Sequence, residues 1–396
     1  MCISKRKSVA RLRQKGDLML IYIIMTILSL IMGCLCTKSI AFSYKVIIRI
    51  RKGSFYLLLM ALICILVMGL RDSSIGQDTP LYVRNFLRIG QYDNLTQALA
   101  QENNAFPVYV ILCRLIYSIS SSPQFHIFVE AAIINIGYFT FVKRTSTDYV
   151  MSTFLYFGMT IIYFAMNGAR QSIAMVLCAN GVVYLTKNLK SIKGWIWFAL
   201  GVGIHISSLI TSIIILGIFL TNRNKKNVKY LTSAFAIAGA LAGSAYVAVA
   251  SVVSRYFNHY TIYFNGAATV GISETSGGGR IVIIYLYIAL FILIYFLQQK
   301  EDKNTESSDI FSKILPGLAF GIFFGIINCR NELINRIVLF FLVYYASCLP
   351  YVIKRCSVHT KRILTATTII GFFMYSLVFL VENQGAVVPY VFFWNG

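Results

Sequence analysis

Long apolar runs, separated by short polar and basic segments, make up most of the chain. A helix that crosses a bilayer needs about 20 mainly apolar residues. We expect membrane-spanning helices at 18–36, 54–70, 124–142, 149–166, 172–186, 230–253, 281–298, 314–328, 337–353 and 363–381. The pattern therefore predicts an all-α polytopic membrane protein.

A further apolar stretch, 194–220, has basic segments on both of its sides. If both flanks are cytoplasmic, the chain must enter the membrane and come back. We expect two short helices here, tilted or re-entrant, with their turn at Gly201, Gly203 and His205. This short hairpin brings the predicted total to about twelve membrane passes.

The stretch 105–121 is apolar except for Arg114 near its middle. An arginine at the centre of a membrane helix costs ~2.5–3.5 kcal/mol on insertion scales. A helix that lies flat at the membrane interface avoids this cost. We therefore predict an interfacial helix that continues the polar segment 71–104 within one large external loop, 71–123.

The distribution of Lys and Arg orients these helices. The chain has 36 Lys+Arg against 14 Asp+Glu, a net charge of +22, and 58% hydrophobic residues. Nucleic-acid binding is a poor explanation, because the basic residues lie mostly in short segments between apolar runs, as the positive-inside rule requires. The predicted cytoplasmic segments are 37–53, 143–148, 187–193, 221–229, the mixed-charge linker 299–313, and 354–362. The predicted outer segments are 71–123, 167–171, 254–280 and 329–336. The first set holds 21 basic residues and the second nine.

A basic extension, 1–18, precedes a single transmembrane domain, 19–396. The extension carries six basic residues, and this topology leaves them outside, against the rule. Either the natural start is Met19, or the N-terminus is inside, 105–121 crosses the membrane, and 71–104 is cytoplasmic. We favour the topology in which 71–104 is external.

Polar side chains collect at the outer ends of the apolar runs. The candidate functional residues are Arg71, Asp78, Arg170, Gln171, His205, Arg280, Arg330 and Arg336. Five arginines and one histidine on a single face suggest that an anionic head group binds there, most simply a diphosphate. For Arg71 and Arg336 the alternative is that they anchor the protein at the membrane interface. Arg170 is harder to explain in this way, because it lies in a very short turn between two helices.

Other features have structural interpretations first. His126 and Glu130, one helical turn apart, are read as a hydrogen-bonded pair, with a proton relay as the alternative. Small residues on one helix face at Gly239-x-x-x-Gly243 and in the run from Gly317 predict close packing within the chain, and dimerisation second. The nine cysteines and four histidines lack the spacing of a metal site, so we expect no metal and no cofactor.

An ordered set of motifs resembles the EpsG-like (Wzy-type) polysaccharide polymerases. In chain order these motifs are Gly69-Leu70-Arg71, Gly76-x-Asp78-x-x-x-Tyr82-x-x-x-Phe86, Asn167-x-x-Arg170-Gln171-Ser172-Ile173-Ala174, His205-x-Ser207-Ser208, and Asn335-Arg336 leading to Leu349-Pro350. The similarity extends from about residue 19 to the end of the chain. The layout also resembles the GT-C-type glycosyltransferases, with an outer acidic loop, a flat helix and a tight hairpin.

The resemblance implies polymerisation of O-antigen or capsule repeat units at the periplasmic face of a bacterial inner membrane. A growing glycan would pass from undecaprenyl diphosphate onto a lipid-linked repeat unit, with inversion. A diphosphate leaving group needs charge neutralisation rather than a general acid, so we expect a metal-independent reaction. The expected catalytic residues are Asp78, Arg170 and His205, and the expected diphosphate-binding residues are Arg71, Gln171, Arg280, Arg330 and Arg336.

The expected partners are an undecaprenyl-diphosphate-linked oligosaccharide, membrane lipid, and a chain-length regulator and a flippase of the same pathway; nucleic acid is not among them. The alternatives are an O-antigen ligase or another lipid-dependent glycosyltransferase, and a flippase or transporter of lipid-linked oligosaccharides. A flippase is expected to show internal repeats and cations deep in its spans. The sequence has no repeat of fixed period, and its arginines cluster at the outer ends of the spans.

Overall fold

All regular structure in the described residues is helical, apart from one isolated antiparallel bridge between Arg71 and Phe392. The computed structural model describes residues 2–37, 52–102, 106–224, 227–256, 278–298, 306–329 and 332–395. The predicted all-α class is confirmed for these ranges.

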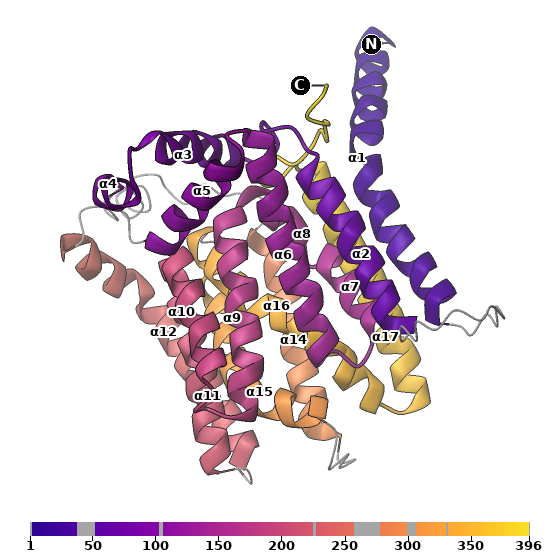
Figure 1. The fold of residues 1–396 in the computed structure, drawn as a ribbon. Helices are drawn as coiled ribbons and strands as arrows, with labels where there is room; N and C mark the ends of the chain where they lie inside the picture. Colours follow the sequence, from indigo (N-terminus) through magenta and orange to yellow (C-terminus); the bar gives the residue numbers. More distant parts are fainter. Residues whose placement is uncertain are drawn as a thin grey trace, which may run out of the picture.

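The helices follow one another with short connections. The first half contains α1 (Cys2–Thr37), α2 (Lys52–Gly69), α3 (Thr79–Gln91), α4 (Leu95–Gln101), α5 (Pro107–Ile119), α6 (Pro123–Thr145), α7 (Tyr149–Gly158), α8 (Ile161–Asn167) and α9 (Ala169–Lys187). The second half contains α10 (Ile192–Ile204), the 3-10 helix η1 (Ile206–Thr211), α11 (Ser212–Arg223), α12 (Val228–Tyr256), α14 (Gly278–Leu297), α15 (Glu306–Ile327), α16 (Glu332–Arg355) and α17 (Val358–Val381). Figure 1 shows the long helices side by side, with α3, α4 and α5 gathered at one end of the bundle.

Several of these helices are long and apolar enough to cross a membrane. In the described residues there are seven, or eight when α7 and α8, which meet at a bend of 50°, count as one broken span. α2, α5, α10 and most of α14 are shorter apolar helices. These features support a multi-pass membrane protein. Each predicted span coincides with one helix, except 149–166, which is divided between α7 and α8; the total of about twelve passes stays a prediction.

Segments that were predicted to be cytoplasmic lie together at one end of the bundle, which we call the basic end. Lys187 at the end of α9 forms an ion pair with Glu306 at the start of α15, with a distance of 2.6 Å. Two turns further along α15, Lys313 donates a hydrogen bond to the Thr186 carbonyl at 2.7 Å. The segments 187–193 and 299–313 therefore meet at the same end, as their charges predict; residues 299–305 of the linker lie outside the described residues.

At the opposite end, which we call the site end, the first loop starts and ends close together. Gln124, at the start of α6, donates its side-chain amide to the carbonyls of Gly69 and Arg71 at the end of α2. The chain between Arg71 and Gln124 thus leaves and re-enters the bundle at one end, and α5 does not cross it. These contacts favour the topology in which 105–121 does not cross the bundle, and the side of the membrane on which this loop lies stays a prediction.

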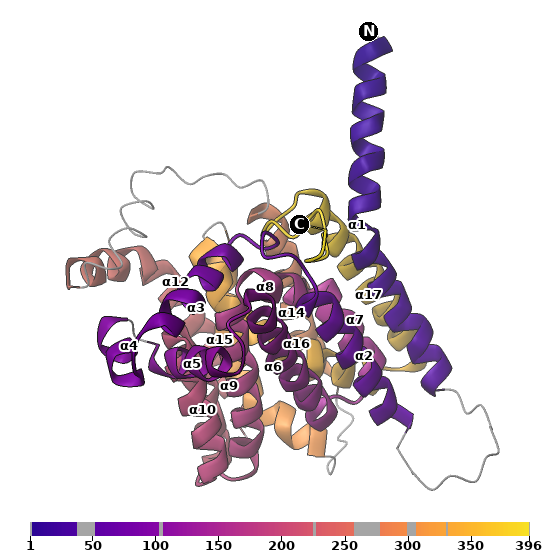
Figure 2. The ribbon, with the colours of Figure 1, turned by 45° about the horizontal axis from the view of Figure 1, so that its top comes forward.

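The N-terminal part of α1 also lies at the site end. Tyr22 donates a hydrogen bond to the Val387 carbonyl at 2.6 Å, and Gly33 packs against Val150, so α1 runs from the site end to the basic end. Figure 2 shows the first part of this helix projecting beyond the bundle. The basic extension 1–18 thus continues the first helix rather than forming a separate fold.

Arg114, the reason for placing α5 at the interface, is bonded within the protein. Its guanidinium donates to the carbonyls of Gly90 and Tyr92, at 2.8 and 2.7 Å, at the C-terminal end of α3. Unpaired carbonyls and the helix dipole favour a cation at this position. On α5, Leu115 and Ile119 are 60% and 76% exposed. The interfacial position of α5 stays a prediction.

The turn predicted in 194–220 lies at His205, whereas Gly201 and Gly203, which were predicted to belong to it, lie inside α10. His205 ends α10 and begins η1, with an extended backbone at φ −152° and ψ 116°. α10 starts near the basic end, and Gly201 packs against Cys178 in the middle of α9. Gly217 of α11 lies near the Lys313 carbonyl, so the chain has returned toward the basic end. The break and reversal at His205 are confirmed.

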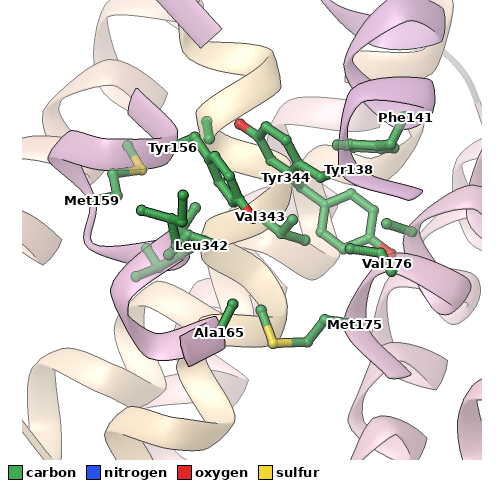
Figure 3. Close-up of a cluster of buried hydrophobic side chains, with 14 of the residues drawn as sticks. Tyr138, Phe141, Tyr156, Met159, Ala165, Met175, Val176, Leu342, Val343 and Tyr344 are labelled. Carbon is green, nitrogen blue, oxygen red and sulfur yellow. The ribbon is translucent and has the colours of Figure 1, made fainter. Parts of the chain in front are cut away.

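Aromatic side chains from α6, α7 and α16 form the centre of the bundle (Figure 3). The rings of Tyr138 and Tyr156 stack with centroids 3.9 Å apart. Their buried hydroxyls donate to the Ser152 carbonyl and to the Asn135 side chain, at 2.9 and 3.2 Å. Buried hydroxyls need such partners because a membrane interior offers no water. Met175 and Val176 of α9 lie in the same cluster, so this core joins α9 to α16.

The small-residue faces pack within the chain, as the first interpretation predicted. A Cβ at Gly239 of α12 would lie 2.3 Å from the Phe320 carbonyl oxygen on α15. On the other side of α15, a Cβ at Gly321 would lie 2.2 Å from the Phe341 ring of α16. The glycines therefore let these helices approach more closely than larger residues would allow.

Candidate functional site

Four separate segments bring predicted site residues to the site end. Asp78 directly precedes α3, Arg170 lies in the first turn of α9, His205 marks the break before η1, and Arg336 lies near the start of α16. Figure 1 shows α3 at this end of the bundle.

The side chains of two predicted arginines lie outside the described part of the structure. Arg280 lies in the first turn of α14, but its side chain is outside the described part of the structure. Arg330 lies outside the described residues altogether. Their predicted role in diphosphate binding stays a prediction.

Asp78 and Arg336 form an ion pair in which Oδ2 lies 3.0 Å from Nη1. The side chains are 24% and 30% exposed, so a ligand at the site end can reach both. Asp78 occupies the N-cap position of α3, but its carboxylate makes no hydrogen bond to the first helical turn. An aspartate at this position ordinarily caps the helix. Here the carboxylate is directed at Arg336 instead.

The loop before Asp78 approaches the end of α8 very closely. Gly76 has φ +92°, and a Cβ there would lie 2.4 Å from the Met166 carbonyl oxygen. Only glycine fits both the left-handed backbone and the short distance. The same Met166 oxygen accepts a hydrogen bond from the Thr79 hydroxyl at 3.1 Å, and the Asp78 amide donates to the Asn167 side chain at 2.9 Å.

Arg71 anchors the other end of this loop from inside the protein. Its side chain is 1% exposed, and its guanidinium donates to the carbonyls of Met68 and Met166. Burial lowers the pKa of Arg71, and the nearby carboxylate of Glu130 opposes that effect. Because the guanidinium is buried, the interpretation of Arg71 as an anchor at the membrane surface is wrong.

A segment that no sequence motif indicated covers this loop. The Asp72 amide donates to the Val391 carbonyl at 2.9 Å, and the Gly76 amide donates to the Ala386 carbonyl at 2.8 Å. The segment after α17 thus pairs with the loop before α3. The aromatic residues near Val391 were the only sequence signal, and they fit a membrane interface equally well.

Arg170 rests on the faces of three aromatic rings. Its Cζ lies 4.0 Å from the ring centroid of Phe106, 5.5 Å from that of Tyr109 and 5.7 Å from that of Tyr82. Aromatic faces attract a guanidinium without using its N–H donors. In the described residues Arg170 has no carboxylate partner, and its Nε has no acceptor. An anionic ligand would supply the missing acceptors.

Gln171, the neighbour of Arg170, is bonded within the protein. Its side-chain amide donates to the Arg336 carbonyl at 2.6 Å. Gln171 therefore holds the main chain that carries Arg336, and its predicted contact with substrate stays a prediction.

His205 is neutral at physiological pH. Burial, followed by the positive charges of Arg170 and Arg336, lowers the pKa of the imidazole to about 3. Its Nδ1 accepts a hydrogen bond from the Ser207 amide at 3.3 Å, which leaves the proton on Nε2 in the neutral ring. The ring lies 5.3 Å from that of Phe106. His205 can thus donate a hydrogen bond but is a poor base.

His126 and Glu130 lie next to each other, and the hydrogen bond predicted between them stays a prediction. Their side chains lie 3.4 Å apart, and both are buried. Tyr109 donates its hydroxyl to Glu130 at 2.9 Å, and Phe86 stacks over His126. Because Tyr109 also contacts Arg170, this pair supports the aromatic side of the site.

Taken together, the site has two guanidinium groups, a neutral imidazole N–H and a carboxylate at one end of a helical bundle. This combination can bind an anion and hold a carboxylate beside it. Within the part of the chain that the structure describes, no three His, Cys, Asp or Glu side chains come together as metal ligands would.

Comparison with known proteins adds one match. A model of a protein family, described as the EpsG family, matches residues 54–392. The matched range contains all the predicted site residues and leaves out α1. No curated protein and no solved structure matches the chain significantly.

Proposed function

Because the chain belongs to the EpsG family, we propose that it is a membrane glycosyltransferase that polymerises polysaccharide repeat units. The observation that carries this proposal is the meeting of Arg170, Arg336 and Asp78 from three distant segments. Two cations beside a carboxylate suit a reaction in which a diphosphate leaves and a hydroxyl attacks.

The proposed donor is a growing glycan on undecaprenyl diphosphate, and the acceptor is the terminal sugar of a lipid-linked repeat unit. The acceptor oxygen attacks the anomeric carbon of the donor from the side opposite the diphosphate. The bond from that carbon to the diphosphate oxygen breaks, and undecaprenyl diphosphate leaves with the electron pair. The acceptor proton passes to the Asp78 carboxylate. The configuration at the anomeric carbon is inverted.

The arginines act on the leaving group. Arg170 is held by aromatic faces, which leave its N–H donors to a ligand, and bidentate bonds from a guanidinium to phosphate are strong. Arg336 is paired with Asp78 in the free protein, so the diphosphate must draw Arg336 away and thereby release the carboxylate. Neutralisation by fixed cations lowers the barrier without a metal. The neutral His205 adds a hydrogen-bond donor.

We place this reaction on the periplasmic face of a bacterial inner membrane. Support comes from the charge distribution, with 21 basic residues in the predicted cytoplasmic segments and nine in the outer ones. A chain-length regulator and a flippase are the proposed partners in the pathway. Arg71, Arg280 and Arg330 complete the proposed positive potential around the diphosphate.

Purified protein with a lipid-linked repeat unit tests the proposal directly. Asp78→Asn keeps the shape of the side chain but removes the base, and we expect turnover to fall by ~10²–10⁴. Arg170→Ala should abolish long chains, while Arg170→Lys should restore only part of the activity, because an ammonium cannot reproduce the bidentate fork.

The matched control is Arg84→Ala. Arg84 is an exposed arginine on α3, close in sequence to Asp78 but not bonded to it. We expect this variant to retain activity. Polymerisation by Asp78→Asn and Arg170→Ala at the wild-type rate would refute the proposed mechanism.

The glycan profile of a deletion strain separates the related functions. Loss of a polymerase leaves a single repeat on the lipopolysaccharide core, whereas loss of a ligase leaves none. Loss of a flippase removes surface repeats. A profile without single repeats would therefore contradict the polymerase assignment.

A further inference from the structure

We propose that Asn167 and Gln171 are positioning residues that set the spacing between the acceptor carboxylate and the diphosphate arginines. The inference rests on the proposed function. Both residues lie beside Arg170, near the turn at the junction of α8 and α9.

Asn167 is the last residue of α8 and is 5% exposed. Its side-chain oxygen accepts the Asp78 amide at 2.9 Å, across 89 residues of chain. The Asp78 carboxylate itself has no bond to its own helix. Its direction therefore depends on the main chain at Asp78, and the side chain of Asn167 holds that main chain.

Gln171 holds the main chain of the segment that carries Arg336. One helical turn after Asn167, its amide donates to the Arg336 carbonyl at 2.6 Å. Asn167 and Gln171 thus flank Arg170 and hold, respectively, the segment of Asp78 and the segment of Arg336. The turn fixes three proposed functional groups relative to one another.

The turn itself is rigid enough for this role. The Gly168 amide donates to the Phe164 carbonyl at 2.6 Å, and the Gly168 carbonyl accepts the Ser172 amide at 3.0 Å. A Cβ at Gly168 would lie 2.7 Å from the Phe164 ring, so the turn is also closely packed. Functional groups held by rigid elements keep the geometry that a reaction needs.

The two residues should have different kinetic signatures. Loss of the Asn167 oxygen frees the Asp78 loop but leaves the arginines in place. Turnover should then fall while the KM for the lipid diphosphate donor stays unchanged. Loss of the Gln171 amide frees the segment of Arg336, which binds the donor, so the main effect should be a higher KM.

The experiment compares Asn167→Ala, Asn167→Asp and Gln171→Met in the purified polymerase. A displacement of about 1 Å can cost on the order of 100-fold in rate, so we expect kcat of Asn167→Ala to fall by about 10- to 100-fold. Asn167→Asp keeps an acceptor oxygen for the Asp78 amide and should recover part of this loss. Hydrogen exchange in a peptide that covers 72–82 should be faster in Asn167→Ala than in the wild type. In Asn167→Asp it should be slower than in Asn167→Ala.

Asn180→Ala is the matched control. Asn180 is a buried amide on α9 that donates to the Gly137 and Val176 carbonyls, at 2.9 Å each, away from the site. The Asn180→Ala variant measures how much activity is lost when removal of a buried amide lowers stability without affecting the site. If Asn167→Ala and Asn180→Ala lose the same activity in proportion to their unfolding temperatures, Asn167 is merely structural and the inference fails.

Other results would also contradict the positioning role of Asn167. Unchanged kcat in Asn167→Ala would show that the contact does not position Asp78, and a change in donor KM alone would assign Asn167 to binding. Wild-type protein that makes no polymer would instead refute the proposed function. In that case, exchange in 72–82 still shows whether Asn167 holds the Asp78 loop.

Discussion

His205 shows how a single position at the site can differ from its usual chemistry. A histidine beside a transferred proton invites the role of general base. Here burial and two neighbouring arginines keep the ring neutral, and the Ser207 amide occupies Nδ1. The remaining Nε2–H can only donate, which leaves Asp78 as the base in the proposed reaction.

The lowered pKa of His205 predicts how stability depends on pH. The unfolded chain protonates this histidine below about pH 6.5, whereas the folded protein does so only near pH 3. The free energy of unfolding should therefore decrease as pH falls through this window. His205→Asn keeps an acceptor for the Ser207 amide but cannot titrate, so its unfolding temperature should decrease less than that of the wild type.

The measurement is thermal unfolding of both proteins in detergent between pH 7 and pH 3. The difference between the two curves isolates His205, because both proteins contain the other titrating groups. Parallel curves across the whole range would contradict the lowered pKa.

At the scale of residues, the sequence identified the charged groups but not what surrounds them. Asp78 and Arg170 stand out because charged residues are rare in and beside the apolar runs, and such residues are often functional. The aromatic rings of Tyr82 and Tyr109 under Arg170 come from α3 and α5, and nothing local to Arg170 indicates them. The pairing of Asp78 with Arg336 joins distant segments and depends on the whole bundle.

At the scale of elements, glycines decide how closely the helices pack. The Gly239 face of α12 meets the main chain of α15, and a carbonyl group cannot move aside as a flexible side chain can. Gly371 of α17 has the opposite surroundings, because a methyl group added there would have no atom within 4 Å. These two positions make a matched pair.

We expect Gly239→Ala to destabilise the protein and Gly371→Ala to leave it unchanged or slightly more stable. Overpacking typically costs ~1–3 kcal/mol, whereas an alanine in an open helical position gains up to about 1 kcal/mol over glycine. Thermal unfolding of the two variants in the same detergent provides the comparison. Equal unfolding temperatures would show that α12 and α15 do not pack as described.

The elements also show where sequence patterns succeed and fail. Basic flanks on both sides of 194–220 required the chain to return to the same side, and the break at His205 followed from that requirement. The charge of Arg114 indicated that α5 is unusual. It could not indicate the end of α3 as the partner, because that contact depends on how two helices cross.

At the scale of the whole molecule, the alternation of helices separates the loops into two sets that agree with the charges. Asp93, between α3 and α4, is exposed near the site end, and Lys190, between α9 and α10, is exposed at the basic end. If the positive-inside rule orients the bundle, Asp93 faces the periplasm and Lys190 the cytoplasm.

Labelling of introduced cysteines tests this orientation. In a background without reactive native cysteines, an impermeant thiol reagent should label Asp93→Cys in intact cells. Lys190→Cys should react only after the inner membrane has been permeabilised. The reverse pattern would place the candidate site in the cytoplasm and remove the proposed reaction with it.

The pairing of the loop before α3 with the segment after α17 has a consequence for biosynthesis. The ribosome makes Asp72 and Gly76 early, but their partners Val391 and Ala386 emerge only after nearly all the helices. A nascent chain that has not yet reached this segment therefore lacks the bonds that join the loop before α3 to it. We expect the acceptor side of the site to be completed only after the segment that follows α17 has been made and has reached the loop before α3.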